Sequence, residues 1–249
     1  MNDDATRAAE DYDAMGAAYA DDVRTHPINA AYERPAMLAM AGDVRGRRVL
    51  DVGCAAGALS ALLVDRGAEV TGIDVSERLV GIARRDLGAR AEFHVADVGR
   101  PMPFLADASF DLVTASLVLH YLRDWAVPLR EFHRVLRPGG ALLVSTHHPT
   151  MDVAISDPPA PYFDLALLTD TWHKGGRDLE VQYYRRPLSA IVDALADAGF
   201  LIERIPEPRP DPADFAGWPG LFERISTGPW FLFIRALKRS FVMLSLASG

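Results

Sequence analysis

Acidic residues end two apolar runs of this chain, in an arrangement that suits a nucleoside ligand. The stretch VLDVGCAAG at 49–57 places Asp51 before a turn of small residues, and VTGIDVS at 70–76 ends its apolar run at Asp74. In nucleotide-binding parallel α/β sheets, the turn after the first strand lets the ligand approach the backbone closely. An acid about 20 positions later, at the end of the second strand, binds the ribose hydroxyls. Gly53 and Asp74 are 21 positions apart. The spacing therefore predicts a nucleoside site.

The composition of this turn separates two kinds of nucleoside cofactor. A pyrophosphate-binding turn follows G-x-G-x-x-G, whereas Ala55 and Ala58 stand here at its second and third glycine positions. Asp51 would also lie close to a diphosphate and repel it. An acidic turn suits a ligand with a sulfonium and an ammonium group, which favours S-adenosylmethionine over NAD. An NAD-dependent oxidoreductase is the competing hypothesis.

Histidines follow two predicted strands at the sheet edge where ligands bind in open α/β folds. His120 follows the apolar run 110–116, and His147 follows the run 141–145. An imidazole, with an unperturbed pKa of about 6.5, can take a proton from a hydroxyl or an amine. We therefore expect His147 and His120 as candidate general bases. The alternative, that both only line the pocket or bond the backbone, stays open.

Strand and helix patterns alternate from about residue 48 to residue 200, which predicts a parallel sheet with right-handed crossovers. Strands are predicted at 49–52, 69–73, 92–95, 110–116 and 141–145, and helices at 58–66, 76–87, 125–136 and 189–198. Two later strands, at 201–205 and 230–237, are joined without a predicted helix, so we expect a hairpin and a reversed last strand. The segment from 150 to 186 shows no regular pattern, and its aromatic residues between Tyr162 and Tyr184 favour the wall of an apolar pocket.

Five ordered blocks carry a resemblance to a known family. They are VLDVGCAAG, GIDVS, VADV at 95–98, FDLVTASLVLHYL at 110–122 and RVLRPGGALLVS at 134–145. With these blocks the chain resembles class I S-adenosylmethionine-dependent methyltransferases, in the small-molecule group similar to the ubiquinone/menaquinone C-methyltransferases. The resemblance covers about residues 45 to 200. It implies a Rossmann-like, seven-stranded, mostly parallel sheet with helices on both faces and a reversed last strand.

The resemblance also implies roles for individual residues. The loop from Asp51 to Gly57 would wrap the methionine moiety, and Asp74 would accept from the ribose hydroxyls. Asp97 and the Val98 amide would bind adenine, Ser116 would lie near the sulfonium, and Tyr19 resembles part of the family's lid. The implied cofactor-binding residues are Tyr19, Asp51, Gly53, Cys54, Ala55, Gly57, Asp74, Val75, Asp97, Val98 and Ser116. Ala55 departs from the glycine that is commoner in the family.

Composition narrows the compartment and the partners. The formal net charge of -8 argues against a nucleic-acid partner, because phosphate contacts need clustered cations. The single cysteine, Cys54, excludes an internal disulfide and a multi-cysteine zinc site. No metal is expected, and the acidic amino-terminal stretch is unlike a signal peptide. No apolar run approaches the roughly 18 residues of a membrane span, so a cytoplasmic protein without a membrane partner is expected.

We expect one methyltransferase domain over residues 1–249. Its parts would be a helical cap at 1–44, a cofactor-binding core at 45–149, a substrate-side insertion at 150–186 and a carboxyl-terminal helix and strand hairpin at 187–249. The expected reaction transfers methyl to a small aromatic or apolar acceptor, O-methylation being favoured over N- or C-methylation, in secondary metabolism. The alternative is a protein that binds S-adenosylmethionine without transferring methyl, as a sensor or a cyclase. A homodimer is left open.

Overall fold

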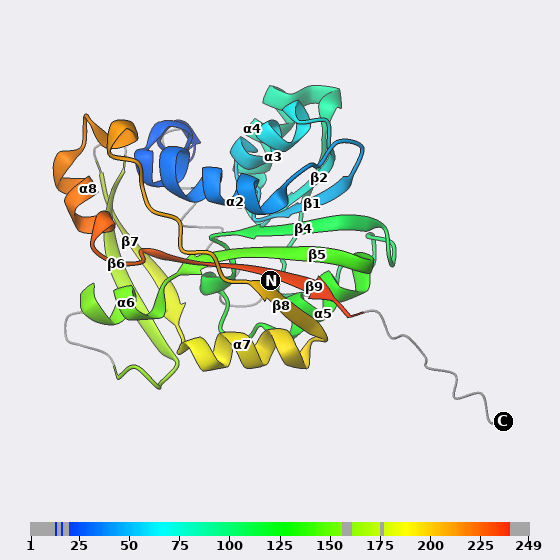
Figure 1. The fold of residues 1–249 in the computed structure, drawn as a ribbon. Coiled ribbons are helices and arrows are strands. Elements are labelled where there is room, and N and C mark those ends of the chain that lie inside the picture. Colours follow the sequence, from blue (N-terminus) through cyan, green and yellow to red (C-terminus); the bar gives the residue numbers. More distant parts are fainter. Residues whose placement is uncertain (1–12, 14–15, 17–19, 156–160, 175–176, 240–249) are drawn as a thin grey trace.

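A seven-stranded, mostly parallel sheet forms the centre of the protein (Figure 1). This computed structural model describes residues 13, 16, 20–155, 161–174 and 177–239. The strand order is β3-β2-β1-β4-β5-β9-β8. The bounds are β1 Arg48–Val52, β2 Glu69–Asp74, β3 Glu92–Val95, β4 Phe110–Ser116, β5 Leu136–His147, β8 Phe200–Arg204 and β9 Phe231–Lys238. Only β9 runs against its neighbours, β5 and β8, which confirms the predicted Rossmann-like sheet with a reversed last strand.

Helices cover both faces of this sheet (Figure 1). On one face lie α2 (Arg34–Ala41), α3 (Ala58–Asp65) and α4 (Glu77–Leu87), and on the other lie α5 (Ala126–Val135) and α7 (Leu188–Asp197). Because both faces are covered, most of β4 and the part of β5 from residue 140 to residue 146 are buried continuously rather than at every second residue. Burial of these apolar side chains is the main favourable term in folding.

Local signals explain why several helices begin and end where they do. The Ser76 hydroxyl accepts a hydrogen bond of 3.1 Å from the Leu79 amide and so caps α4. Gly88, at φ +55°, ends the same helix in a conformation that side chains disfavour. Short helical turns complete the chain: η1 Ile28–Glu33 (a π-helix), η2 Gly88–Arg90, η3 Leu119–Tyr121 and η4 Pro212–Phe215.

Two sequence expectations are corrected by the structure. The segment 150–186 is not irregular: it holds α6 (Pro149–Ile155) and an antiparallel hairpin of β6 (Ala166–Lys174) and β7 (Arg177–Arg185). The last two strands are not joined without a helix, because η4 and α8 (Pro219–Ser226) lie between them. Tertiary contacts decide both regions: Val181 and Tyr183 of β7 pack on Tyr121, and Ile225 of α8 packs in the core beside Phe233.

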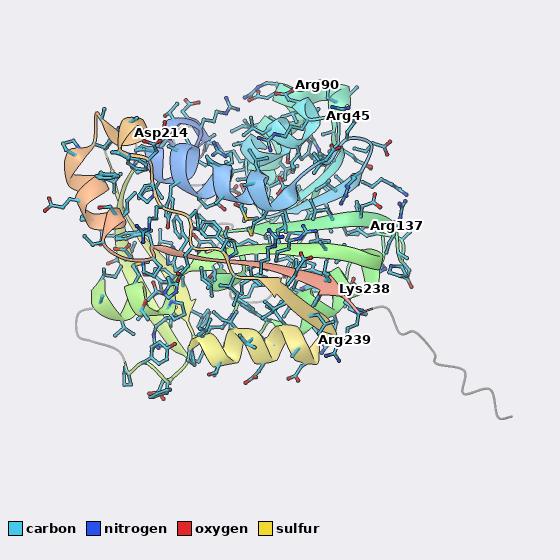
Figure 2. All side chains as sticks on the ribbon, in the orientation of Figure 1. Arg45, Arg90, Arg137, Asp214, Lys238 and Arg239 are labelled. Carbon is cyan, nitrogen blue, oxygen red and sulfur yellow. The ribbon has the colours of Figure 1, made fainter. Side chains whose placement is uncertain are left out.

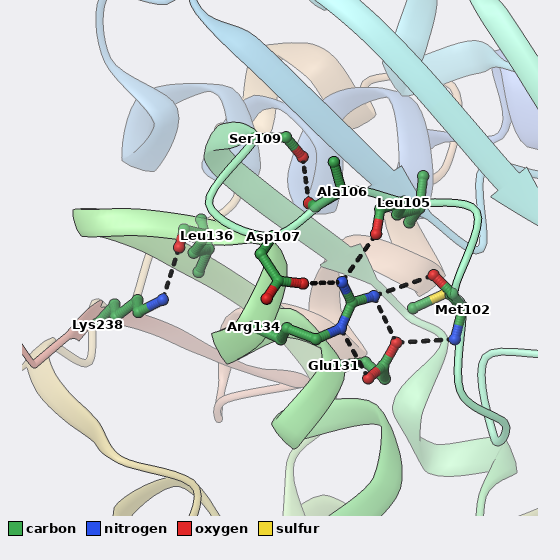
Figure 3. Close-up of polar contacts among 9 residues, drawn as sticks. All are labelled: Met102, Leu105, Ala106, Asp107, Ser109, Glu131, Arg134, Leu136 and Lys238. Carbon is green, nitrogen blue, oxygen red and sulfur yellow. Dashed lines mark hydrogen bonds and ion pairs between the residues drawn. The ribbon is translucent and has the colours of Figure 1, made fainter.

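Arg134 of α5 fastens the long connection that leads from β3 to β4 (Figure 3). Its guanidinium donates to the carbonyl oxygens of Leu105 and Met102 at 2.8 and 3.0 Å and pairs with Asp107 at 2.6 Å. Glu131 binds the same guanidinium at 2.8 Å and accepts from the Met102 amide. This network holds the connection against α5 just after the sheet edge at which the predicted Asp97 lies.

Four cationic side chains lie at one end of the sheet. Arg45 precedes β1, Arg90 precedes β3, Arg137 lies at the start of β5, and Lys238 ends the reversed strand β9. Figure 2 shows these labelled cations on one side of the molecule and Asp214 on the other. The amino-terminal edge of the sheet therefore carries these cations, opposite the edge at which ligands bind in such sheets.

Candidate functional site

A cavity opens at the carboxyl ends of four neighbouring strands, β3, β2, β1 and β4. It holds about 1140 Å³ of empty space, including the open solvent at its mouth. Nine of the eleven predicted cofactor-binding residues line it: Asp51, Gly53, Cys54, Ala55, Asp74, Val75, Asp97, Val98 and Ser116. Gly57 is not among the lining residues, and Tyr19 lies outside the described residues. Folding thus gathers four separate sequence blocks around one space.

The turn after β1 brings backbone, rather than side chains, to the cavity wall. Gly53 has φ +67°, and a Cβ atom there would lie 2.6 Å from Cγ2 of Val118, so only glycine fits. Gly57 has φ +79° and precedes α3. A Cβ atom at Gly57 would lie 3.2 Å from the Cβ atom of Ala83, so this glycine allows close packing against α4.

Two non-glycine residues on the cavity wall have a strained backbone. Ala55 has φ +47° and Leu117 has φ +48°, in the left-handed region that costs side chains roughly 1–2 kcal/mol. The Ala55 amide donates to Asp74 at 2.9 Å, and the Leu117 amide donates to the Ser145 hydroxyl and to its carbonyl, both at 3.0 Å. Such strain persists where surrounding contacts fix it, and it concentrates at binding sites.

Asp74 ends β2 and Asp97 follows β3, and both line the cavity at the ends of these adjacent strands. One Asp74 oxygen accepts from the Ala55 amide, and the other accepts from the Ser76 amide at 2.9 Å. Burial raises the pKa of the Asp74 carboxyl, and these amide donors oppose the shift. Asp97 accepts from the Gly99 amide at 2.8 Å and lies 3.3 Å from the Arg100 guanidinium.

Asp51 is buried at the end of β1. Its two oxygens accept hydrogen bonds from the hydroxyls of Ser60 at 2.5 Å and Thr114 at 2.8 Å. Burial raises the pKa of the Asp51 carboxyl to about 6, although both hydroxyls lower it. A carboxyl group held in this way is costly to ionise without a cation nearby, so the site suits a positively charged ligand group.

Glu33, at the end of η1, is a cavity-lining carboxyl group that the sequence analysis missed. One of its oxygens, Oε1, accepts from the hydroxyls of Ser116 at 2.7 Å and Ser145 at 2.5 Å. Burial raises the pKa of the Glu33 carboxyl, while the two hydroxyls and then Arg34 lower it. The signal in the sequence was an acid, Glu33, inside the apolar helical stretch AAYERPAMLAM. This stretch alone does not show which residues Glu33 would contact.

The two predicted bases come together, but neither lines the cavity. His120 is 2% exposed, and both of its ring nitrogens are buried with no hydrogen-bond partner among the described residues. His147 stacks on it and lies 3.4 Å from an Asp152 carboxylate oxygen. Tyr183 packs edge-on against both rings. The nearest cavity-lining ring is Tyr121, whose centroid is 4.2 Å from that of His120.

Comparison with known proteins identifies a matching family and similar structures. A family model described as "Methyltransferase domain" matches residues 50–144. An S-adenosylmethionine-dependent methyltransferase structure from Mesorhizobium loti is 29% identical, with a TM-score of 0.67 over 84% of this chain and 99% of that chain. A putative enzyme of the same kind from Listeria monocytogenes is 24% identical, with a TM-score of 0.73 over 86% and 100% of the two chains.

The chain belongs to the class I S-adenosylmethionine-dependent methyltransferases. It is therefore an enzyme whose cofactor is S-adenosylmethionine. An uncharacterized protein of Haemophilus influenzae is 28% identical over 246 residues, which are 87% of this chain and 91% of that protein.

Two relatives of this methyltransferase have named activities. A malonyl-[acyl-carrier protein] O-methyltransferase of Pseudescherichia vulneris is 35% identical over 53% of each chain. A ubiquinone biosynthesis O-methyltransferase of Aromatoleum aromaticum is 39% identical over 41% of this chain and 44% of that protein. The methyltransferase thus spans about half the length of these relatives. Among the helices of its described part, none is long and apolar enough to cross a membrane.

Proposed function

We propose that this methyltransferase transfers methyl to the oxygen of a small aromatic or otherwise apolar acceptor. The names of two relatives, the malonyl-[acyl-carrier protein] and ubiquinone biosynthesis O-methyltransferases, support oxygen as the methylated atom. Apolar side chains along the cavity, among them Val118, Tyr121 and Leu122, support an apolar acceptor. A place in secondary metabolism and action within a single domain over residues 1–249 stay predictions.

The cavity fits the cofactor in chemistry as well as in position. Gly53 leaves room at the wall that a Cβ atom would fill, and buried Asp51 favours a nearby cation. In this proposal the turn from Asp51 to Ala55, with Cys54, holds the amino-acid end, while Asp74 and Val75 hold the ribose. When bound, S-adenosylmethionine supplies a methyl group already activated by a sulfonium.

The remaining wall residues complete the proposed cofactor site. Asp97 and the Val98 amide would hold the adenine, and Ser116 would face the sulfonium side. Gly57 acts by packing α3 against α4, as its contact distances support. The role of Tyr19 stays a prediction. Because the methyl donor is already reactive, the protein's main task is to align the acceptor, and alignment alone can supply about 7–11 kcal/mol of the barrier reduction.

Deprotonation of a hydroxyl acceptor requires a base. His147 and His120 stay predictions for that base, and their place at the carboxyl ends of the strands supports them. An acceptor in the cavity would meet Tyr121 before it met His120, because Tyr121 lines the cavity and His120 does not. The catalytic role of His147 is therefore tested beside that of Glu33, a carboxyl group that lines the cavity.

One observation carries the proposal: the predicted residues at the carboxyl ends of four separate strands line a single cavity. Calorimetry with S-adenosylhomocysteine would test the cofactor site, and we expect binding with micromolar affinity or tighter. Labelled S-adenosylmethionine would then be incubated with catechol, a simple phenol, an aromatic amine and benzoate. We expect O-methylated products from the phenolic compounds. Product carrying methyl only on nitrogen or carbon, or no product from any acceptor while the cofactor binds, would contradict the proposal.

A further inference from the structure

Of the candidate bases, only the Glu33 carboxyl both lines the cavity and is buried at the carboxyl ends of β4 and β5. We propose that Glu33 is a catalytic residue: it contacts the acceptor and takes its hydroxyl proton, and the acceptor is a neutral hydroxyl compound rather than an anion. This inference rests on the proposed function, whose acceptor class and base it specifies.

The contacts of Glu33 fix its orientation and leave one oxygen for a ligand. The Ser145 hydroxyl accepts from the Leu117 amide at 3.0 Å, so its own proton points to Oε1 of Glu33. The Ser116 hydroxyl donates to the same oxygen. Within the described part of the chain, no hydrogen bond reaches the second oxygen, Oε2. Since Glu33 lines the cavity and is only 3% exposed, Oε2 is the atom available to an acceptor.

Burial gives this carboxyl group the basicity that the task requires. It raises the pKa of Glu33 above the ordinary value, and nearby Asp51 acts in the same direction. A carboxylate with a raised pKa takes a proton more readily than an exposed one. His120 differs in two ways: burial holds its pKa well below the ordinary value, and its ring does not line the cavity.

The charges on the cavity wall select the acceptor. Among the described residues, four carboxyl groups and one guanidinium line it: Glu33, Asp51, Asp74, Asp97 and Arg34. An excess of negative groups raises the free energy of a bound anion and favours neutral or cationic ligands. A carboxylate acceptor also has no proton to lose, so a base would serve no purpose for it. A neutral phenol or catechol satisfies both conditions.

The proposed step conserves atoms and electrons. The O–H bond of the acceptor breaks, and its proton passes to Oε2 of Glu33. The electron pair left on oxygen forms the new carbon–oxygen bond. The methyl–sulfur bond breaks as that bond forms, and its electron pair stays on sulfur, so the positive charge of the sulfonium is lost. No oxidant, reductant or metal is required.

E33Q is the decisive variant, because its amide oxygen still accepts from Ser116 and Ser145 while the side chain cannot take a proton. We expect its kcat with catechol to fall by about 10²–10⁴-fold, with the affinity for S-adenosylhomocysteine changed by less than threefold. We expect the kcat of the wild-type protein to fall towards acid pH and the kcat of E33Q to show no such fall.

A kcat loss of the size expected for E33Q, found in H147A and not in E33Q, would make His147 the base and overturn the proposal. D65N, at an exposed acid that pairs with Arg90, is the control and should keep wild-type kcat. A thermal melt would check that each variant folds.

Binding provides a readout that does not depend on turnover. In calorimetry on protein loaded with S-adenosylhomocysteine, the Kd for catechol should be at least tenfold lower than the Kd for benzoate. In E33Q the ratio of these two Kd values should be smaller. Equal binding of benzoate and catechol to the wild-type protein would overturn the acceptor class. E33Q turnover within threefold of wild type, or a loss matched wholly by weaker cofactor binding, would overturn the base. If no acceptor in the panel is methylated, the proposed function fails, whereas the binding ratio still decides the acceptor class.

Discussion

The imidazole rings of His120 and His147 stack with their centroids 4.5 Å apart and their planes inclined by 18°. His120 follows β4 and His147 ends β5, so two neighbouring parallel strands bring the rings together. Burial, followed by the charges of His147 and Arg186, holds the pKa of His120 well below its ordinary value. His120 is therefore neutral in the folded protein across the physiological pH range.

Acid should destabilise the protein through His120. In the unfolded chain this imidazole binds a proton below about pH 6.5, whereas the folded protein keeps it neutral. Stability is thus highest above that pH and falls by up to about 1.4 kcal/mol per pH unit below it. Urea unfolding at pH 7.5, 6.0 and 5.0 should show a shallower fall for His120→Phe than for wild type. His94→Phe, at a half-exposed strand position, is the control, and equal slopes for all three proteins would refute the assignment.

Asp74→Ala should weaken cofactor binding. Loss of a carboxylate that accepts from a ligand hydroxyl costs about 1–3 kcal/mol, which is roughly a 5- to 150-fold weaker Kd for S-adenosylhomocysteine by calorimetry. The Ala55 and Ser76 amides also lose their acceptor, so a thermal melt must accompany the titration. Asp65→Ala removes an exposed acid that pairs with Arg90 and should leave the Kd unchanged. Unchanged affinity in Asp74→Ala would mean that this carboxylate does not bind the ribose.

The turn after β1 should respond oppositely to two small substitutions. Ala55 has a left-handed backbone at φ +47°, and Ala55→Gly should remove a strain of roughly 1–2 kcal/mol. The greater flexibility of glycine in the unfolded chain offsets about 0.4–1 kcal/mol of this gain. A Tm increase of about 1–4 °C is therefore expected. Gly53→Ala places a Cβ atom 2.6 Å from Val118 and should lower stability by about 2–4 kcal/mol. Calorimetric melts of both variants check this pair; a lower Tm for Ala55→Gly would contradict it.

Arg134→Met should destabilise the protein more than a matched surface change. It removes two ion pairs and leaves the Leu105 and Met102 carbonyls without their donor, so we expect a loss of about 1–3 kcal/mol. Arg137→Met breaks a more exposed pair with Asp111 and should cost less than about 1 kcal/mol. The urea midpoints of the two variants compare their losses of stability. Similar losses would show that the contacts of Arg134 contribute no more to stability than a surface ion pair does.

Asp51→Asn should improve stability at alkaline pH. The folded protein holds the Asp51 pKa at about 6, whereas the unfolded chain ionises it near 4. The contribution of the Asp51 carboxyl to the stability of the wild-type protein is therefore greatest below about pH 4. It is lost as the pH rises to about 6. Asparagine can still accept from one hydroxyl partner and carries no charge. Denaturation at pH 8 should favour the variant, while its affinity for S-adenosylmethionine should fall. A variant less stable than wild type at pH 8 would contradict this.

The sequence alone was sufficient for features that depend on neighbours along the chain. The apolar runs of β1, β2 and β4, the cap at Ser76 and the small-residue turn at 53–57 are local patterns, and each predicted its element. Because parallel strands align their carboxyl ends, the same patterns also predicted that Asp51, Asp74 and Asp97 would share one edge. The reversed last strand was predicted as well, although from a hairpin that the helix α8 interrupts.

Only the tertiary structure determined how distant segments meet. Glu33 bonds Ser116 and Ser145, which are 83 and 112 positions away, and no local pattern identifies such partners. The hairpin of β6 and β7 owes its conformation to packing on Tyr121, so its own sequence appeared irregular. The same holds for the imidazole pair: spacing placed both histidines at one edge, but burial and packing decided that their rings stack beside the cavity rather than line it.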